Sequence, residues 1–113
     1  MASPNYGEVW FADLDPVVGH EQAGERPVLI LSITSFNQSP AGLVVILPVT
    51  TKIRGIPWHV PVSPPEGGLT RPSVILCEAL RSVSQQRIQY RMGAASAATM
   101  QAVQDRLRIL MNL

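Results

Sequence analysis

Residues 96–111 read SAATMQAVQDRLRILM, and this stretch distinguishes a mixed fold from an all-β one. Its apolar side chains recur every three or four residues, at Met100, Val103, Leu107, Leu110 and Met111. That spacing is typical of one buried stripe along an α-helix. Ser96 is a suitable N-cap, and the two alanines after it favour a first helical turn. The stretch therefore predicts one amphipathic helix at the end of the chain.

The sequence before this helix has the pattern of short β-strands. Ten prolines and eight glycines fall mostly between short apolar runs, as turn residues do between the strands of a β domain. The expected strands are Glu8–Asp15, Pro27–Ile33, Leu43–Val49, Trp58–Val62, Ser73–Cys77 and Arg81–Ser84. Pro48 lies inside one of them, so we expect a bulge or an edge position there. The order of elements predicts a mainly β (α+β) fold, a small barrel or curled sheet with the helix packed on it.

Length and charge limit the possibilities further. The 113 residues suffice for a single domain, residues 1–113, with one hydrophobic core. Since 46% of the residues are apolar and only 15% are charged, some apolar surface is left over, and dimerisation would cover it. The net charge of +1 excludes a global basic field, but residues 1–48 carry −4 and residues 49–113 carry +5. The later strands can therefore form a local basic face.

Cysteine, histidine and hydropathy bear on metal sites and location. The single cysteine, Cys77, excludes an intrachain disulfide and a Cys-based metal site, and its apolar neighbours predict a core position. His20 and His59 are far apart in the sequence, and we expect His59 to be an ordinary strand residue. We therefore expect no metal and no cofactor. No apolar run reaches the ~18 residues of a membrane span and no signal peptide opens the chain, so we expect a cytoplasmic protein with no membrane partner.

Three polar segments lie where strands begin or end, and each has two interpretations. Arg26 closes the polar loop 19–27, so it either reaches into a cleft or pairs with a carboxylate of its own loop. In residues 48–52, two threonines and a lysine either hold a phosphate or only form a turn. Glu78 lies between apolar residues, where it is either a general base or half of an ion pair with a nearby arginine.

Together these segments resemble the MazF/PemK/Kid family of toxin–antitoxin endoribonucleases, also called mRNA interferases. The family's opening pattern is G-[DE]-[VI]-[WY]-x3-L-x-P, then G-x-E-Q-x-G-x-R-P and an apolar strand, and Glu8–Asp15 with Pro16–Ser32 resembles it without a gap. Leu47–Thr50 is similar to the family's P-[VI]-T strand end, and Ser73–Arg81 to its later strand pair. The resemblance covers almost the whole chain, including the closing helix.

The resemblance implies a homodimer of small SH3-like β-barrels that cuts single-stranded RNA at a short recognition sequence without a metal. It also implies a MazE-like antitoxin that blocks the RNA site. By position, Arg26 and Thr50 match the family's most general catalytic pair, while His20 and Glu78 match catalytic residues of its Kid branch. That branch has Asp in place of Glu78 and a catalytic arginine in place of Leu76, so its mechanism does not transfer in full.

The expected reaction uses the nucleophile that RNA itself carries. The 2′-hydroxyl attacks the adjacent phosphate and leaves a 2′,3′-cyclic phosphate and a 5′-hydroxyl. Arg26 suits the phosphate because its guanidinium is planar and permanently charged. Thr50, or Thr51 one residue on, would donate a further hydrogen bond, and the general base stays open between His20 and Glu78. The expected RNA-binding residues are Gln22, Thr51, Lys52, Arg54 and Arg81.

Two other functions remain open at this point. A gyrase-poisoning toxin of the CcdB group shares the barrel, but that group lacks the G-x-E-Q-x-G-x-R-P loop. A catalytically inactive homologue would only bind the antitoxin, and the joint presence of Arg26, Thr50, His20 and Glu78 argues against it. Trp58 is expected in the core or at a sheet edge rather than stacked on a base.

Overall fold

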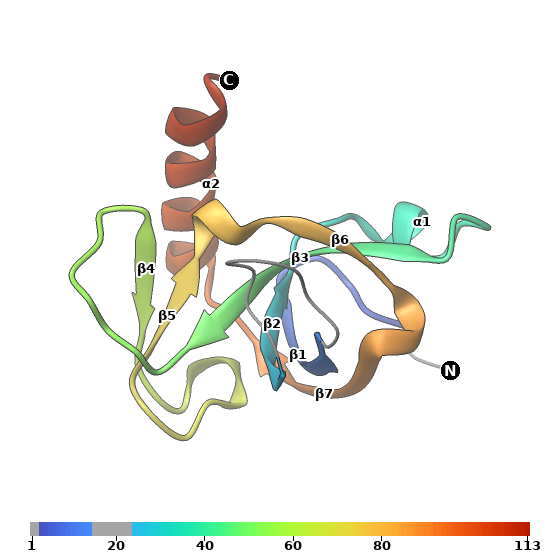
Figure 1. Cartoon of the computed structure of the whole chain (residues 1–113), viewed down its shortest axis with the longest axis horizontal. Helices are drawn as coiled ribbons and strands as arrows, with labels where there is room; N and C mark the ends of the chain where they lie inside the picture. Colours follow the sequence, from blue (N-terminus) through green and yellow to red (C-terminus); the bar gives the residue numbers. More distant parts are fainter. Residues whose placement is uncertain (1–2, 15–23) are drawn as a thin grey trace.

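The computed structural model describes residues 3–14 and 24–113. Seven strands are followed by one long helix, and short helices join some of the strands (Figure 1). The strands are β1 (Glu8–Asp13), β2 (Glu25–Ile30), β3 (Leu43–Thr50), β4 (His59–Val62), β5 (Ser73–Leu76), β6 (Arg81–Ser84) and β7 (Ile88–Ala94). The helices are α1 (Thr34–Asn37), η1 (Glu66–Gly68), η2 (Cys77–Ala79), η3 (Gln85–Arg87) and α2 (Ala97–Met111). The predicted α+β class is confirmed.

The strands form one antiparallel sheet that does not close into a barrel. Its order is β4-β5-β3-β2-β1-β7, and β6 pairs with the first half of β3. Among the described residues β4 and β7 end this order, which corrects the expectation of a closed barrel. In its place η1 packs against β7 backbone to backbone: a Cβ on Gly68 would lie 2.1 Å from the Met92 carbonyl oxygen, and one on Gly93 2.6 Å from the carbonyl carbon of Gly67. Only glycine permits so close an approach.

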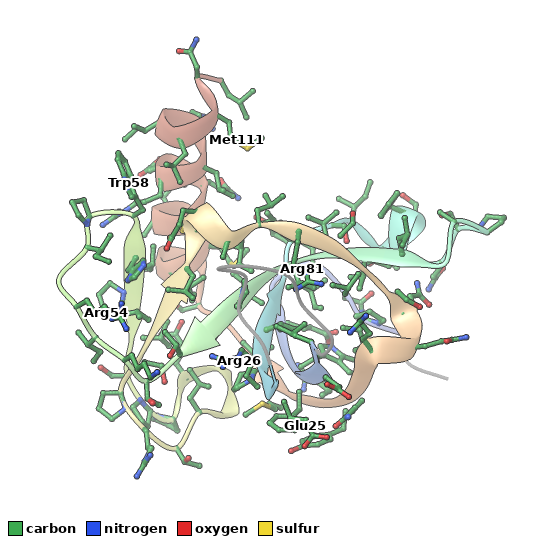
Figure 2. All side chains as sticks on the ribbon, viewed as in Figure 1. Glu25, Arg26, Arg54, Trp58, Arg81 and Met111 are labelled. Carbon is green, nitrogen blue, oxygen red and sulfur yellow. The ribbon has the colours of Figure 1, made fainter. Side chains whose placement is uncertain are left out.

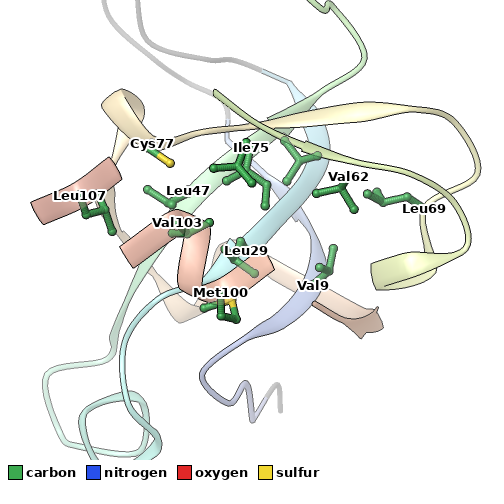
Figure 3. Packing of buried hydrophobic residues seen from close by; sticks show 12 residues of the cluster. Val9, Leu29, Leu47, Val62, Leu69, Ile75, Cys77, Met100, Val103 and Leu107 are labelled. Carbon is green, nitrogen blue, oxygen red and sulfur yellow. The ribbon is translucent and has the colours of Figure 1, made fainter. Parts of the chain in front are cut away.

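Alternate residues of β1, β2 and β3 enter two different cores. Leu29, Leu47 and Val49 belong to the larger core, which α2 covers through Met100, Val103 and Leu107 (Figure 3). The neighbouring residues Val28, Ile30, Val44 and Ile46 belong to a second core on the other face, together with Trp10 and Val83. A strand that is buried on both faces reads as a continuous apolar run, which explains the sequences of β2 and β3.

The closing helix has the ends that its sequence predicts. The Ser96 hydroxyl accepts a hydrogen bond from the Thr99 backbone N–H (3.1 Å), and Asn112 ends the helix in the left-handed region at φ 57°. The Ser96 N–H in turn donates to Glu66 of η1 (2.9 Å), which fastens the η1 loop to the start of α2. Within residues 3–14 and 24–113, no helix is long and apolar enough to cross a bilayer.

Candidate active site

An open groove of about 690 Å³ lies where β2 and β3 separate. The ladder between these strands ends at the pair Val28–Pro48, although β2 begins at Glu25 and β3 runs on to Thr50. The groove crosses the sheet from β4 to β7. Its lining comprises Phe11, Glu25, Arg26, Pro27, Val49, Thr50, Thr51, Lys52, Arg54, Ile56, His59, Leu69, Thr70, Arg71, Ser73, Leu76, Glu78, Tyr90 and Met92.

Arg26 and Thr50 occupy corresponding positions on the two diverging strands. Each lies two residues beyond the last ladder pair, Val28–Pro48, and both are half-buried in the groove wall. The Thr50 Oγ1 accepts a hydrogen bond from the Lys52 backbone N–H at 3.2 Å. Because a hydroxyl has one donor and two acceptor sites, this contact leaves its proton available to a ligand oxygen. The groove thus brings together a guanidinium and a hydroxyl, both able to hold a phosphate.

Glu78 enters the same groove from η2, where it meets a partner that the sequence did not single out. His59 Nε2 lies 2.9 Å from Glu78 Oε2, and because a carboxylate only accepts, Nε2 carries the hydrogen in this contact. The His59 side chain is 6% exposed and that of Glu78 is 41% exposed. Among the described residues, the buried Nδ1 of His59 has no hydrogen-bond partner. His59 is a strand residue, as expected, since it begins β4; its buried side chain in addition contacts the Glu78 carboxylate.

The partner of Glu78 is therefore a histidine, not the arginine that the ion-pair interpretation of the sequence expected. Cross-strand pairing of His59 with Leu76 brings the two side chains together, since Glu78 follows Leu76 by two residues. No local sequence pattern reveals a contact made by pairing two strands. The carboxylate keeps an exposed face toward the groove while the imidazole holds its other side.

The charge of the groove is positive. Among the described lining residues four are basic (Arg26, Lys52, Arg54 and Arg71) and two are acidic (Glu25 and Glu78), which leaves a surplus of two positive charges in this part of the lining. Figure 2 shows Arg26 on β2 and Arg54 in the loop between β3 and β4, and both residues line the groove. Arg71 lies between η1 and β5; its loop could be expected to line the groove, although Arg71 was not singled out as a site residue.

The remaining predicted site residues divide into three groups. Thr51, Lys52 and Arg54 line the groove as expected. Arg81 does not line it: Arg81 pairs with Ile46 in the part of the sheet that β6 forms, where it is half-buried. His20 and Gln22 lie outside the described residues. Trp58 is half-buried beside the start of β4 and does not line the groove.

Cys77 has the core position that its neighbours predicted. The residue is 1% exposed. Burial, followed by the nearby negative charge of Glu78, raises the pKa of the thiol to about 11. Because the thiolate is the reactive form of cysteine, this side chain has no nucleophilic role. Within the described part of the chain, no group of three or more His, Cys, Asp or Glu side chains could hold a metal ion.

Comparison with known proteins agrees with this geometry. Residues 5–111 match the family described as PemK-like, MazF-like toxin of type II toxin-antitoxin system. The chain belongs to this family. It is 36% identical to Endoribonuclease EndoA of Bacillus subtilis (strain 168) over 108 residues, which are 95% of this chain and 93% of that protein. The family predicted from the sequence and its class of activity, endoribonuclease, are confirmed.

Solved MazF structures have the same fold. A crystal structure of MazF from Deinococcus radiodurans superimposes with a TM-score of 0.90 at 29% identity and covers 100% of both chains. A MazE–MazF crystal structure from the same organism gives a TM-score of 0.81 at 30% identity and covers 100% of this chain and 99% of that one. The CcdB alternative gains no support from these matches.

Proposed function

We propose that this MazF-like toxin cuts single-stranded RNA at a short recognition sequence, with the scissile phosphate held between Arg26 and Thr50. One observation supports the proposal above all: Arg26 and Thr50 line one open groove whose described lining carries more basic than acidic residues. A fixed cation beside a developing negative charge is typically worth ~3 kcal/mol of transition-state stabilisation. The endoribonuclease relative supports RNA as the substrate.

The reaction needs one proton removed and one added. The 2′-oxygen forms a bond to phosphorus and gives its proton to Glu78, while the bond from phosphorus to the 5′-oxygen breaks. The leaving 5′-oxygen takes up a proton from solvent and becomes the 5′-hydroxyl, and the phosphate remains as a 2′,3′-cyclic ester. Arg26 binds the non-bridging oxygens as charge accumulates on them. His59 orients Glu78 through their 2.9 Å contact, and His20 remains the other candidate for proton transfer.

Proton removal by Glu78 makes a metal unnecessary for activating the nucleophile. General acid–base catalysis by a positioned side chain contributes roughly 10²–10⁴-fold. The groove is open and crosses the sheet, which suits an extended single strand whose bases are unstacked. Thr51, Lys52, Arg54 and Arg71 would contact the phosphates or bases on either side of the cut.

Two protein partners belong to the same proposal. A second copy of the chain would cover the exposed apolar side chains at the end of α2, where Ile109, Met111 and Leu113 are 66%, 56% and 85% exposed. An antitoxin would block the groove, and the MazE–MazF complex of the Deinococcus radiodurans relative supports such a partner. Sedimentation of the purified chain tests the dimer, and co-purification with the product of a neighbouring reading frame tests the antitoxin.

The nuclease is tested by incubating the purified protein with a long unstructured RNA in EDTA and mapping the new ends. Discrete cuts are expected, and Arg26→Ala should reduce the cleavage rate at least 10²-fold while the unfolding transition is retained. Arg108→Ala is the matched control, because Arg108 lies near the end of α2, outside the groove, and contacts Asp105. A wild-type protein that binds RNA without cutting it would be the inactive homologue, and a normally active Arg26→Ala would remove Arg26 from the active site.

A further inference from the structure

The end of the groove farthest from His59 is formed by two stacked aromatic rings. Phe11 of β1 and Tyr90 of β7 are cross-strand partners, with ring centroids 5.2 Å apart and an interplanar angle of 21°. Both line the groove that contains Arg26 and Thr50. Phe11 is half-buried, whereas Tyr90 is 55% exposed. One face of the tyrosine ring is therefore covered by Phe11, and much of the rest is open.

A cross-strand aromatic pair is often explained by sheet stability alone, but that explanation does not account for the exposure of Tyr90. Such pairs contribute at most about 1 kcal/mol to a sheet. β7 ends the strand order, so its side chains are not needed to cover a further strand. The Tyr90 ring nevertheless lines a groove whose described lining also contains Arg26, Lys52, Arg54 and Arg71. An open aromatic face in a basic groove is typical of proteins that bind single-stranded nucleic acid.

We infer that Phe11 and Tyr90 form a stacking platform for one nucleobase of the RNA strand, on the Tyr90 side of the scissile phosphate. The inference rests on the proposed function and adds a subsite to it. Strand β1 alone separates β2, which carries Arg26, from β7, so the platform lies on the order of 10 Å from the phosphate site across the sheet. Arg26 and Thr50 hold the phosphate, and the platform fixes a nearby base.

Stacking makes a definite prediction about sequence selectivity. Every base has a π-face, so a platform without hydrogen-bonding groups tolerates any base but rejects an abasic position. Tyr90 adds a hydroxyl at the ring edge, which would give at most a weak preference. The base at this subsite should therefore be among the least selective positions near the cut, while still being needed for affinity.

The experiment measures RNA binding by Tyr90→Ala with Tyr90→Phe as the matched control. The probe is a random-sequence single-stranded RNA of about 12 nucleotides, with fluorescence anisotropy as the readout in EDTA. Tyr90→Ala should raise Kd about 5- to 150-fold, and Tyr90→Phe should stay within about twofold, since the ring is kept. Ile33→Ala, an exposed apolar residue outside the groove lining, should have no effect.

A second arm locates the stacked base. After the wild-type cut is mapped, a series of oligonucleotides carries a 2′-deoxy nucleotide at the cut and an abasic site at each neighbouring position in turn. At one position the losses caused by the abasic site and by Tyr90→Ala should not add, because both remove the same stack. Losses that add at every position, or equal affinity of Tyr90→Ala and wild type, would overturn the inference.

The outcomes separate the platform from the nuclease. If wild type cuts and Tyr90→Ala binds normally, the nuclease stands and the platform fails. If wild type cuts nothing but Tyr90→Ala still weakens binding to the random-sequence probe, the platform stands without the nuclease. If Tyr90→Ala instead changes the sedimentation coefficient and RNA binding falls only with dissociation, the ring belongs to an interface between copies, and the platform is refuted.

Discussion

Glu78→Gln is the substitution that most directly tests the proposed chemistry. Glutamine has the same shape, and its carbonyl oxygen can still accept the hydrogen that His59 Nε2 donates at 2.9 Å. The variant should therefore fold as wild type does while losing the proton acceptor. Loss of a general base costs roughly 10²–10⁴-fold, or about 2.7–5.4 kcal/mol of activation free energy at 1.36 kcal/mol per tenfold. We expect this loss in kcat, with KM nearly unchanged.

The assay is single-turnover cleavage of an oligonucleotide that spans the mapped cut. Glu25→Gln is the control, because Glu25 is an exposed carboxylate in the same groove and its removal changes the charge equally. If Glu25→Gln and Glu78→Gln change the rate by the same factor, the effect is general electrostatics and the base is elsewhere. A Glu78→Gln protein that cuts within about threefold of wild type would refute the reasoning.

The contribution of His59 is separated by a double-mutant cycle. If His59 acts only by positioning Glu78, His59→Ala should lower kcat in the wild-type background and have little further effect in Glu78→Gln. His59→Gln, which keeps a donor, should recover part of the activity. A full additional loss in the double variant would mean that His59 takes part in the reaction itself or supports the fold independently.

Two further predictions concern the η1 loop, which forms part of the groove wall. Gly68→Ala should lower the free energy of unfolding, measured in urea, by more than about 1 kcal/mol. Gly55→Ala is the control and should cost less, because Gly55 has a similar φ of +66° but open space around it. Equal losses would show that the backbone contact with β7 does not contribute to stability. Glu66→Gln should weaken the pH dependence of stability. Burial raises the pKa of Glu66, but hydrogen bonds from Thr99 and Ser96 outweigh it and hold the pKa below the ordinary 4.5. The Glu66 carboxylate therefore stabilises the fold above that value, and this stabilisation is lost as the pH falls through the lowered pKa. Urea titrations below about pH 4.5 should show that the free energy of unfolding falls more steeply with pH in wild type than in Glu66→Gln. Equal slopes in the two proteins would contradict the role assigned to Glu66.

The parts of the fold that could be predicted are those with strong local signals. The helix α2 has a regular apolar stripe and an N-cap, and the structure begins it directly after Ser96. Strand β7 was not expected, although Ile88, Tyr90 and Met92 alternate with Gln89 and Arg91 as in a half-buried strand. This alternation is short, and most of Ile88–Ala94 is exposed or half-buried. The closed barrel was expected from the family resemblance, and the η1 contact takes the place of its last ladder.

The site residues also divide into those that local sequence motifs identify and those that depend on strand pairing. Arg26, Thr50 and Glu78 were identified because each belongs to a motif beside a strand end, and the structure brings them into one groove. His59 and Tyr90 were not identified because their places depend on partners far along the chain, Leu76 for His59 and Phe11 for Tyr90. Arg81 was expected to bind RNA, yet it pairs with Ile46 and does not line the groove.

Pro48 and Glu78 are two consequences of one break in the sheet. Strand β3 pairs Ile46 with Arg81 in β6 and Val49 with Ile75 in β5. Between these pairs β3 advances by three residues, whereas the opposite chain advances by six and uses the excess to form η2. Pro48 lies between the β6 ladder and the β5 ladder, on the edge of β3 that faces these two strands. Among the described residues neither strand pairs with it there, so the N–H that proline lacks costs no hydrogen bond. Glu78 belongs to the segment that lies outside both ladders, and it lines the same groove as Arg26 and Thr50. Pro48 lies opposite this break in the sheet, which is where a strand tolerates a proline.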